Sequence, residues 1–293
     1  MSVVPNSAWT LPWRRALIAA AALMLAACSS VTLFYTFADT AIENEITHYL
    51  DVDDDERARI AEKVDALMRW HRTEILPRYA SFLRAQAATI ESGEITRETV
   101  TASYGQVREL MYATLRGAFA PAASILVNHT GTAKLDHLRR RLTEAMEDRA
   151  ERAKRPRADR IERRANRFVE NIERFTGPLN KDQIALIRRY AEATDDETFL
   201  WINYRVRREE AFLRFLAMRP DEAEIAAFLE KVLVHAEDIV GPRYRTDLDT
   251  SARRFQDLMA RIAAISTPKQ RRTAAGRLRD YADDFTWLSE HMF

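Results

Sequence analysis

The chain has 293 residues, of which 47% are hydrophobic and 30% are charged, and its formal net charge is +1. This composition allows a substantial core in one or two compact domains, and it excludes a disordered chain or a multi-span membrane protein. The balanced charge provides no general field that would draw the chain to nucleic acid. Only seven glycines are spread along the sequence, so glycine-rich phosphate loops and the nucleotide-binding folds that need them are not expected.

The first 27 residues have the pattern of an export signal. Arg14 and Arg15 precede an apolar stretch from Ala16 to Leu25, and small residues follow it up to Cys28. Cys28 is the single cysteine, whereas exported proteins normally use cysteines in pairs. Residues 25–28 (Leu-Ala-Ala-Cys) resemble the bacterial lipobox. This resemblance implies a signal peptide at residues 1–27, cleavage just before Cys28, and a diacylglyceryl group on the Cys28 sulfur.

A single membrane anchor is the competing interpretation of this segment. It would join the apolar stretch that ends at Leu25 to residues 31–37, giving about the twenty residues that a bilayer needs. The break formed by Cys28, Ser29 and Ser30 argues against one continuous span. The residue that follows the cysteine is Ser29 rather than an aspartate. In this respect the sequence is similar to lipoproteins that are sorted to the outer membrane. The predicted location is therefore the cell envelope, with a lipid anchor in the outer membrane and the protein facing the periplasm.

From about residue 31 to the end, apolar residues recur at three- and four-residue steps, which predicts successive amphipathic helices. One such stripe consists of Ile161, Ala165, Phe168, Ile172 and Phe175. Glycine and proline breaks divide the region into about eight or nine helices. Because the connections are short, we expect one all-α domain over residues 28–293, built as an irregular multi-helix bundle or a short helical array.

Several helix starts are predicted from capping boxes, in which one side chain caps the first turn and a residue three positions on returns the hydrogen bond. The expected pairs are Asp53 with Glu56, Asn180 with Gln183, Thr194 with Glu197, Asp221 with Glu224, and Thr267 with Gln270. The acidic run that begins at Asp51 also partly matches a calcium-binding loop. Glu56, however, stands where such a loop needs glycine, so a capped helix start is favoured, and neither a metal nor a cofactor is predicted.

Two clusters of aromatic and basic residues are candidate binding surfaces. They consist of Trp70, His71, Arg72 and Tyr79 in the first, and of Trp201, Tyr204 and Arg205 in the second. Either cluster could line a groove. The alternative is that the rings pack between helices and keep their polar tips at the surface of the domain.

Arginine is dense between Arg139 and Arg174, a region that is expected to form one helix. Acidic residues such as Glu144, Glu147 and Glu162 are interleaved with the arginines. A solvated, salt-bridged helix is favoured, because interspersed carboxylates cancel much of the field. A mildly basic face for lipid phosphates or another envelope polymer is the alternative.

The chain resembles an uncharacterised family of proteobacterial lipoproteins over nearly its whole length. The resemblance rests on the lipobox, the helix start at residues 50–56, the segment 70–79 and the segment 177–183. The resemblance implies a location in the cell envelope but no activity. A weaker similarity relates Leu179–Gln183 and Ile265–Gln270 to the Leu-Thr-x-x-Gln motif of Spy/CpxP-like periplasmic proteins, which are helical and hold client chains on a concave surface. Asn180 replaces the threonine in the first segment, and the second has one extra residue.

Sequence motifs of catalysis do not stand out. No serine lies in a Gly-x-Ser-x-Gly elbow, and Cys28 is expected to carry lipid. We therefore expect a non-catalytic binding or adaptor protein, with chaperone-like holding as one form. Its expected partners are the membrane, through Cys28, and envelope proteins or polymers, but not nucleic acid. Two alternatives stay open: an envelope enzyme with a carboxylate or histidine site, and a lipid- or peptidoglycan-binding module that uses the arginine-rich helix.

Overall fold

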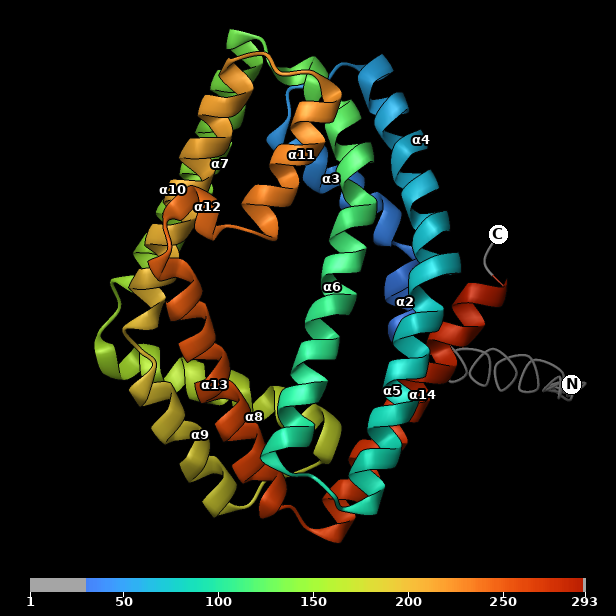
Figure 1. Ribbon diagram of the computed structural model, residues 1–293, viewed down its shortest axis with the longest axis vertical. Helices are drawn as coiled ribbons and strands as arrows, with labels where there is room; N and C mark the ends of the chain where they lie inside the picture. Colours follow the sequence, from blue (N-terminus) through green and yellow to red (C-terminus); the bar gives the residue numbers. More distant parts are fainter. Residues whose placement is uncertain (1–29, 292–293) are drawn as a thin grey trace, which may run out of the picture. The chain divides into compact units, whose positions relative to one another are not determined.

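The structure is a computed structural model that describes residues 30–291 (Figure 1). The described residues form helices and no strand, which confirms the predicted all-α class. The chain divides into two compact units, residues 1–38 and residues 39–293. In the first unit the structure describes the short helix α2 (Ser30–Thr36). The predicted cleavage site and Cys28 lie outside the described residues.

Eleven helices of 12 residues or more are present in the described chain, rather than the eight or nine predicted. They are α3 (Ala38–Tyr49), α4 (Asp54–Trp70), α5 (Leu76–Ser92), α6 (Arg97–Leu126), α7 (Thr132–Ala153), α8 (Arg157–Thr176), α9 (Lys181–Ala193), α10 (Glu197–Ala217), α11 (Glu222–Leu233), α13 (Arg243–Ala264) and α14 (Pro268–His291). Three short elements join them: the π-helical turn η1 (His71–Ile75), the 3-10 helix η2 (Val127–His129) and α12 (Glu237–Val240).

The prediction of one helix between Arg139 and Arg174 is wrong, and this break contributes to the higher count. α7 ends at Ala153, and α8 begins at Arg157 directly after Pro156. Proline lacks an N–H and disfavours helical backbone in the residue before it, here Arg155, so a helix cannot easily continue through this point. The arginine-rich region therefore forms a corner between two helices.

Helical backbone continues through Pro77, by contrast. The N–H of Leu76 donates to the carbonyl of His71, five residues earlier, so the chain forms a π-helical turn between α4 and α5. A wider turn of this kind is one way to accommodate a proline without ending the helix. It joins α4, η1 and α5 into a nearly unbroken run of helical backbone from Asp54 to Ser92.

Four of the five predicted capping boxes are confirmed. The backbone N–H groups of Glu56, Gln183, Glu224 and Gln270 donate to the side chains of their predicted partners over 2.7 to 3.1 Å. The box at Thr194 is wrong. Its hydroxyl donates to the Tyr190 carbonyl over 2.7 Å at the end of α9, and α10 begins only at Glu197, whose carboxylate accepts from Arg254.

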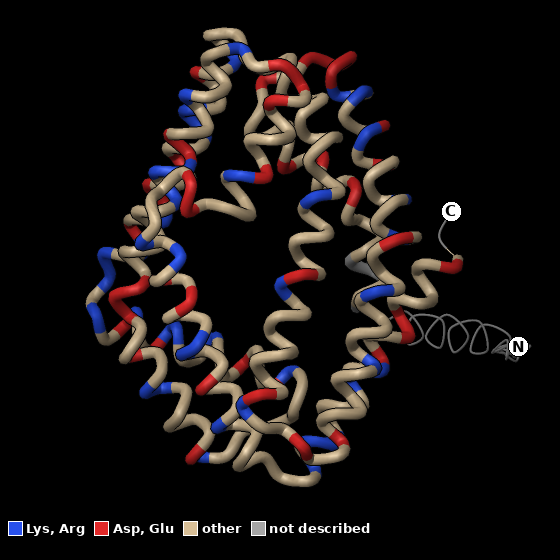
Figure 2. Tube along the Cα trace, in the orientation of Figure 1, with Lys and Arg blue, Asp and Glu red and all other residues tan. Residues whose placement is uncertain are grey.

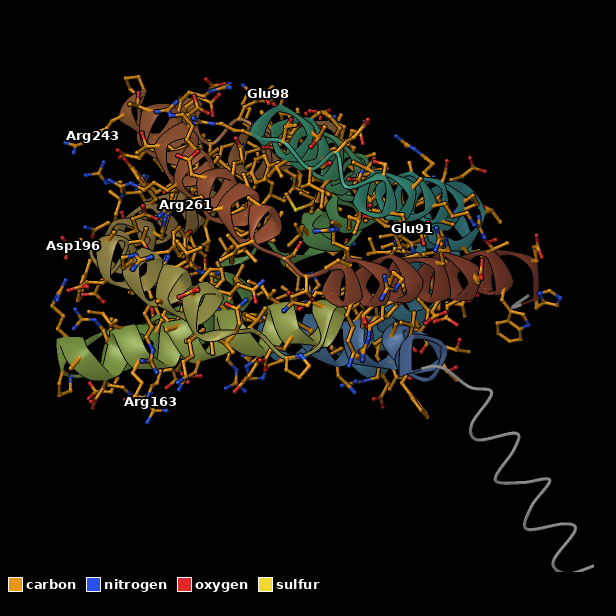
Figure 3. All side chains as sticks on the ribbon, turned by 90° about the horizontal axis from the view of Figure 1, so that it is seen from below. Glu91, Glu98, Arg163, Asp196, Arg243 and Arg261 are labelled. Atoms are coloured by element: carbon orange, nitrogen blue, oxygen red, sulfur yellow. The ribbon has the colours of Figure 1, made fainter. Side chains whose placement is uncertain are left out.

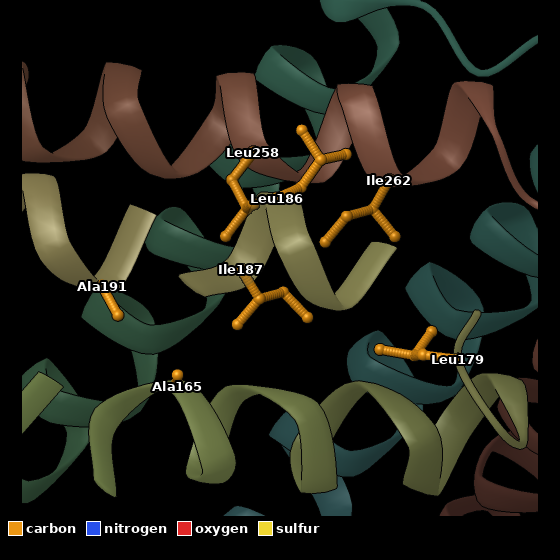
Figure 4. Packing of buried hydrophobic residues seen from close by; sticks show 7 residues of the cluster. All are labelled: Ala165, Leu179, Leu186, Ile187, Ala191, Leu258 and Ile262. Atoms are coloured by element: carbon orange, nitrogen blue, oxygen red, sulfur yellow. The ribbon is translucent and has the colours of Figure 1, made fainter. Parts of the chain in front are cut away.

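A hydrophobic core cluster lies where α8, α9 and α13 meet. It contains Ala165, Leu179, Leu186, Ile187, Ala191, Leu258 and Ile262 (Figure 4). Ile161, Phe168 and Ile172 pack against it, as the predicted stripe on α8 requires. Phe175, at the end of that stripe, is 36% exposed and contacts the Tyr281 ring instead.

Helices that are distant in sequence lie side by side in the second unit. α14 packs along α5 (Figure 1), α11 packs along α6, and α10 packs along α7. The cluster of α8, α9 and α13 is joined to α14 through α8, and to α6 through α13. These contacts bring residues that are far apart in the chain close together in space.

α6 is unusually apolar for a helix with so much exposed surface. By length and composition, the segment Arg97–His129 is the one helix among residues 30–291 that is long and apolar enough to cross a membrane, and 22% of its most apolar stretch is buried. In this structure it packs against α4, α11 and α13. Apolar side chains therefore remain accessible along it.

Candidate functional site

An apolar cavity of about 510 Å³ lies between α5, α6, α8, α13 and α14, with a wall residue from α9. Ligand cavities typically have volumes of about 300 to 1,000 Å³ and mainly apolar walls with a few polar groups. This cavity fits that description. Its larger apolar wall residues are Ile90, Ile95, Val100, Tyr104, Val107, Ile172, Phe255, Met259 and Ile262.

Several polar groups in the cavity wall are hydrogen-bonded to one another. Ser103 on α6 donates its hydroxyl to the amide oxygen of Gln86 on α5 over 2.5 Å, and it also donates to the Thr99 carbonyl over 2.8 Å. Gln183 and Gln270 are buried and form a second pair. These internal bonds meet much of the polar demand of the wall without a ligand.

The Gln183 and Gln270 pair joins two capping boxes. Each amide nitrogen donates to the other's amide oxygen, over 3.1 Å from Gln183 and 2.9 Å from Gln270. The Gln183 oxygen also accepts from the Asn180 N–H, and the Gln270 oxygen accepts from the Thr267 N–H, each over 2.9 Å. The two motif segments of the sequence thus meet side chain to side chain, which fixes the starts of α9 and α14 against each other.

The first predicted cluster packs between helices. The Trp70 ring lies over Gly117 on α6, where a Cβ atom would come within 1.9 Å of Trp70 Cη2. Tyr79 shares a 2.7 Å hydrogen bond between its hydroxyl and that of Thr114, and its ring lies 6.1 Å from the His71 ring. Burial lowers the pKa of His71, and the neighbouring charge of Arg72 lowers it further. These contacts favour the packing interpretation over an open groove.

The second predicted cluster lies on α10 and is divided in two. Tyr204 is buried, donates to the Asp247 carboxylate over 2.6 Å, and stacks edge to face with Tyr244. Burial raises the pKa of Tyr204, and the hydrogen bond to Asp247 raises it further, so its hydroxyl is held protonated. The Trp201 ring lies 5.8 Å from the Tyr204 ring, which extends this aromatic group.

Arg205 points elsewhere and forms a 2.7 Å ion pair with Glu209. Both residues line a pocket of about 210 Å³ between α7, α10 and α11. None of the seven candidate residues lies among the described residues that line the apolar cavity. The sequence therefore identified aromatic packing groups and missed the cavity.

The acidic helix start at Asp53 has a structural role. Asp53 caps α4, and the Glu56 carboxylate is bound by Lys134 on α7 and by the Asp53 N–H. Burial alone would raise the pKa of Glu56, but these hydrogen bonds outweigh it and lower the pKa. Within residues 30–291, no three His, Cys, Asp or Glu side chains are grouped so that they could hold a metal ion.

Another pocket, of about 380 Å³, lies at the corner between α7 and α8 and reaches the start of α10. We call it the arginine pocket. Its wall consists of Arg149, Arg152, Ala153, Arg155, Arg160, Arg163, Arg164, Arg167, Asp195, Thr198 and Ile202. The wall thus contains seven arginines and one carboxylate. Positive charge is more concentrated here than the alternation of acids and arginines in the sequence indicates.

One sequence signal could have located the cavity. Val100, Tyr104, Val107 and Met111 recur at three- and four-residue steps on α6, and the first three line the cavity. Val107 and Met111 are 48% and 49% exposed. The long apolar helix α6, with its few charges, could thus have indicated one wall of the cavity. The walls that face it come from segments far away in the chain.

The fold is all-helical and encloses a mainly apolar cavity. The chain belongs to DUF6279, a family of unknown function, whose family model matches residues 48–245. This result confirms membership of an uncharacterised family. The comparisons with curated proteins and with solved structures found no match. The matched range contains the whole arginine pocket, whereas it ends near the start of α13 and excludes the α14 wall of the apolar cavity.

Proposed function

We propose that this protein is a non-catalytic binding protein of the cell envelope, and that its apolar cavity receives apolar side chains from an amphipathic helix of a partner protein. The observation that carries the proposal is the cavity of about 510 Å³ with its mainly apolar wall. Burial of apolar surface in such a site stabilises a complex by about 25 cal/mol for each Å² removed from water. An adaptor or a chaperone-like holder would use a site of this kind.

The polar groups of the wall limit what can occupy the cavity. The Ser103 hydroxyl is bound to Gln86 and Thr99, and Gln183 is bound to Gln270. An extended peptide would bring unpaired N–H and C=O groups to a wall that offers few partners, and each unpaired group is costly to bury. A helix satisfies its backbone internally, so a helix can present apolar side chains alone.

α6 extends the contact surface beyond the cavity. Val100, Tyr104, Val107 and Met111 cover about 16 Å along the helix axis, from the 1.5 Å rise per residue. Val107 and Met111, at the outer end, are about half exposed. A strip of this length matches about three turns of a partner helix, which would offer one apolar anchor for each turn. The flexible Met111 side chain suits partners of varied shape.

The chemistry of the wall supports a non-catalytic role. The Ser103 hydroxyl donates to an amide oxygen and to a carbonyl, and neither group can accept a proton as a general base. Tyr204, which has a raised pKa, lies outside the cavity wall. These features favour binding over acyl or proton transfer.

The envelope location is proposed from the sequence. The lipobox at residues 25–28 and the single cysteine support a lipid anchor on Cys28. We expect Cys28→Ala to remain as a longer, unprocessed and unlipidated precursor when the chain is expressed in its bacterial host. Normal processing of this variant, measured by mass spectrometry of the mature protein, would contradict the lipid anchor.

The binding role is tested with a photocrosslinking amino acid at Val107 in the full chain, in intact cells. Two matched variants separate the cavity from the surface: Ala263 lines the cavity, and the adjacent Ala264 is exposed. Because phenylalanine at Ala263 would fill part of the cavity, we expect Ala263→Phe to abolish the crosslinks to a small, reproducible set of polypeptides. Ala264→Phe should preserve them.

Two outcomes would contradict this function. Crosslinks that persist equally in Ala263→Phe would show that the partner does not use the cavity. Adducts of lipid alone, with no polypeptide, would reject the helix as occupant and assign the cavity to hydrocarbon chains.

A further inference from the structure

The arginine pocket gathers charge from two helices and from the corner between them. α7 contributes Arg149 and Arg152 from its last turns, and the connection contributes Arg155. Figure 2 shows basic positions recurring along this region. Because Pro156 ends one helix and begins the next, side chains from both are directed to one pocket.

α8 separates its charges by helical spacing. Arg160, Arg163, Arg164 and Arg167 follow one another at steps of three, one and three residues and all line the pocket. The interleaved acids of the same helix, Asp159, Glu162 and Glu170, are not part of the pocket wall. The arginines of α8 thus gather in the pocket wall without the acids of the same helix.

The one carboxylate in the wall is already occupied. Asp195 is buried, with its side chain 3% exposed, and accepts from Arg160 over 3.0 and 2.5 Å. Arg157 approaches the same carboxylate at 3.6 Å. Asp195 thus holds Arg160 at the edge of the pocket. It forms no ion pair with the other arginines of the wall.

Most of the arginines in the wall have no anionic partner. Arg152, Arg155, Arg163 and Arg167 form no ion pair with a carboxylate in the described part of the chain, and Arg163 extends away from α8 (Figure 3). Arg164 forms no ion pair in this part of the chain either, but its guanidinium lies over the Tyr190 ring at 5.8 Å from the ring centre. Like charges that line one pocket repel one another, so an anion in the pocket would relieve this repulsion.

We propose that the arginine pocket binds a phosphate group. The planar guanidinium fork forms paired hydrogen bonds with phosphate oxygens, and a phosphate offers several oxygens and up to two negative charges to a cluster of this kind. A single carboxylate would neutralise much less of the charge. The volume of about 380 Å³ also holds part of the molecule that carries the phosphate. The pocket shares no wall residue with the apolar cavity, so this site is independent of the proposed function.

The test uses the purified full chain with one double variant and one matched control. Arg163→Gln with Arg167→Gln removes two exposed arginines from the pocket, and Arg188→Gln with Arg189→Gln removes two exposed arginines of α9 that do not line it. One arm measures the affinity for inorganic phosphate. The other measures the gain in affinity for phosphatidylcholine vesicles when phosphatidylglycerol is added.

We expect the pocket variant to weaken binding by about tenfold or more, because charge-assisted bonds to phosphate are lost. The control should stay within about twofold, and added salt should weaken wild-type binding. A selective loss in the phosphate arm identifies a free phosphate compound as ligand, and a selective loss only in the vesicle arm identifies a lipid headgroup. Equal weakening in both variants, or no binding in either arm, would overturn the proposal.

Discussion

The apolar cavity and the arginine pocket are built in opposite ways. The cavity takes its wall from residues between Gln86 and Ala274, contributed by six helices that meet only after folding. The pocket takes its wall from residues 149–202, and five of its seven arginines come from α8 and the corner before it. The first site depends on distant packing, whereas the second depends mainly on one proline and on helical spacing. The two should therefore respond differently to mutation.

The largest expected effect is at the amide pair that supports the cavity wall. Gln183→Ala removes the capping bond that the Gln183 side chain accepts from the Asn180 N–H, and it leaves one N–H of the buried Gln270 amide without its acceptor. We expect a loss of about 3 kcal/mol in the free energy of unfolding, measured by denaturant titration. The matched control is Glu224→Ala, which breaks an exposed capping box and should cost about 1 kcal/mol. Equal losses would show that the amide pair adds nothing to the cap.

The contact between Trp70 and Gly117 should have the next largest effect. A methyl group at Gly117 would overlap the indole ring, so Gly117→Ala should destabilise the protein by about 2 kcal/mol despite the better helix propensity of alanine. Gly105 lies on the same helix and has open space around it. Gly105→Ala should raise stability by about 0.5 to 1 kcal/mol. A thermal unfolding series in which both variants gain stability would contradict the described packing of Trp70.

The arginine pocket should show the reverse behaviour. Arg163→Gln with Arg167→Gln removes mutual repulsion and breaks no ion pair in the described chain. We expect the free energy of unfolding at low salt to stay the same or to rise by up to about 0.5 kcal/mol. This gain should disappear as salt is added, because salt screens the repulsion. A clear destabilisation would show that these two arginines support the fold and would remove the contrast with the cavity.

The smallest effect is expected at Glu56, far from both sites. Its pKa is lowered in the folded state, so its bonds stabilise the fold above the unfolded pKa near 4.5 and are lost as the pH falls through the folded value. Glu56→Gln should therefore lower stability near neutral pH and flatten its decline towards acid, as measured by unfolding from about pH 6 to about pH 3. Glu62→Gln, an exposed change on the same helix, serves as control. An unchanged pH profile in Glu56→Gln would contradict the role assigned to Lys134.

Local features of the fold could be predicted from the sequence. The capping boxes at Asp53, Asn180, Asp221 and Thr267 are confirmed, because a cap depends on residues three positions apart. Thr194 misled the prediction, since Asp195 is bound by Arg160 and the next helix starts later. The break at Pro156 was also visible in the sequence but was outweighed by the continuous run of charged helix formers.

The candidate sites were less accessible to sequence reasoning. Aromatic clusters attract attention in a sequence, but Tyr79 and Tyr204 are held by Thr114 and Asp247 in helix packing. The stripe of Val100, Tyr104 and Val107 on α6 is the one local signal of the cavity, and the walls that face it come from helices distant in the sequence. The density of arginine was evident from the sequence. That seven arginines gather in one pocket apart from the neighbouring acids became clear only once the boundary between α7 and α8 was known.

The most direct test of the cavity as a binding site is the fluorescence of N-phenyl-1-naphthylamine, which brightens in apolar surroundings, titrated into the purified full chain. The proposal predicts saturable enhancement in the wild type and in Ala264→Phe, and a strong loss in Ala263→Phe, with both variants keeping the wild-type helical circular dichroism. Equal enhancement in the two variants would show that the apolar cavity is not the site that takes up the probe.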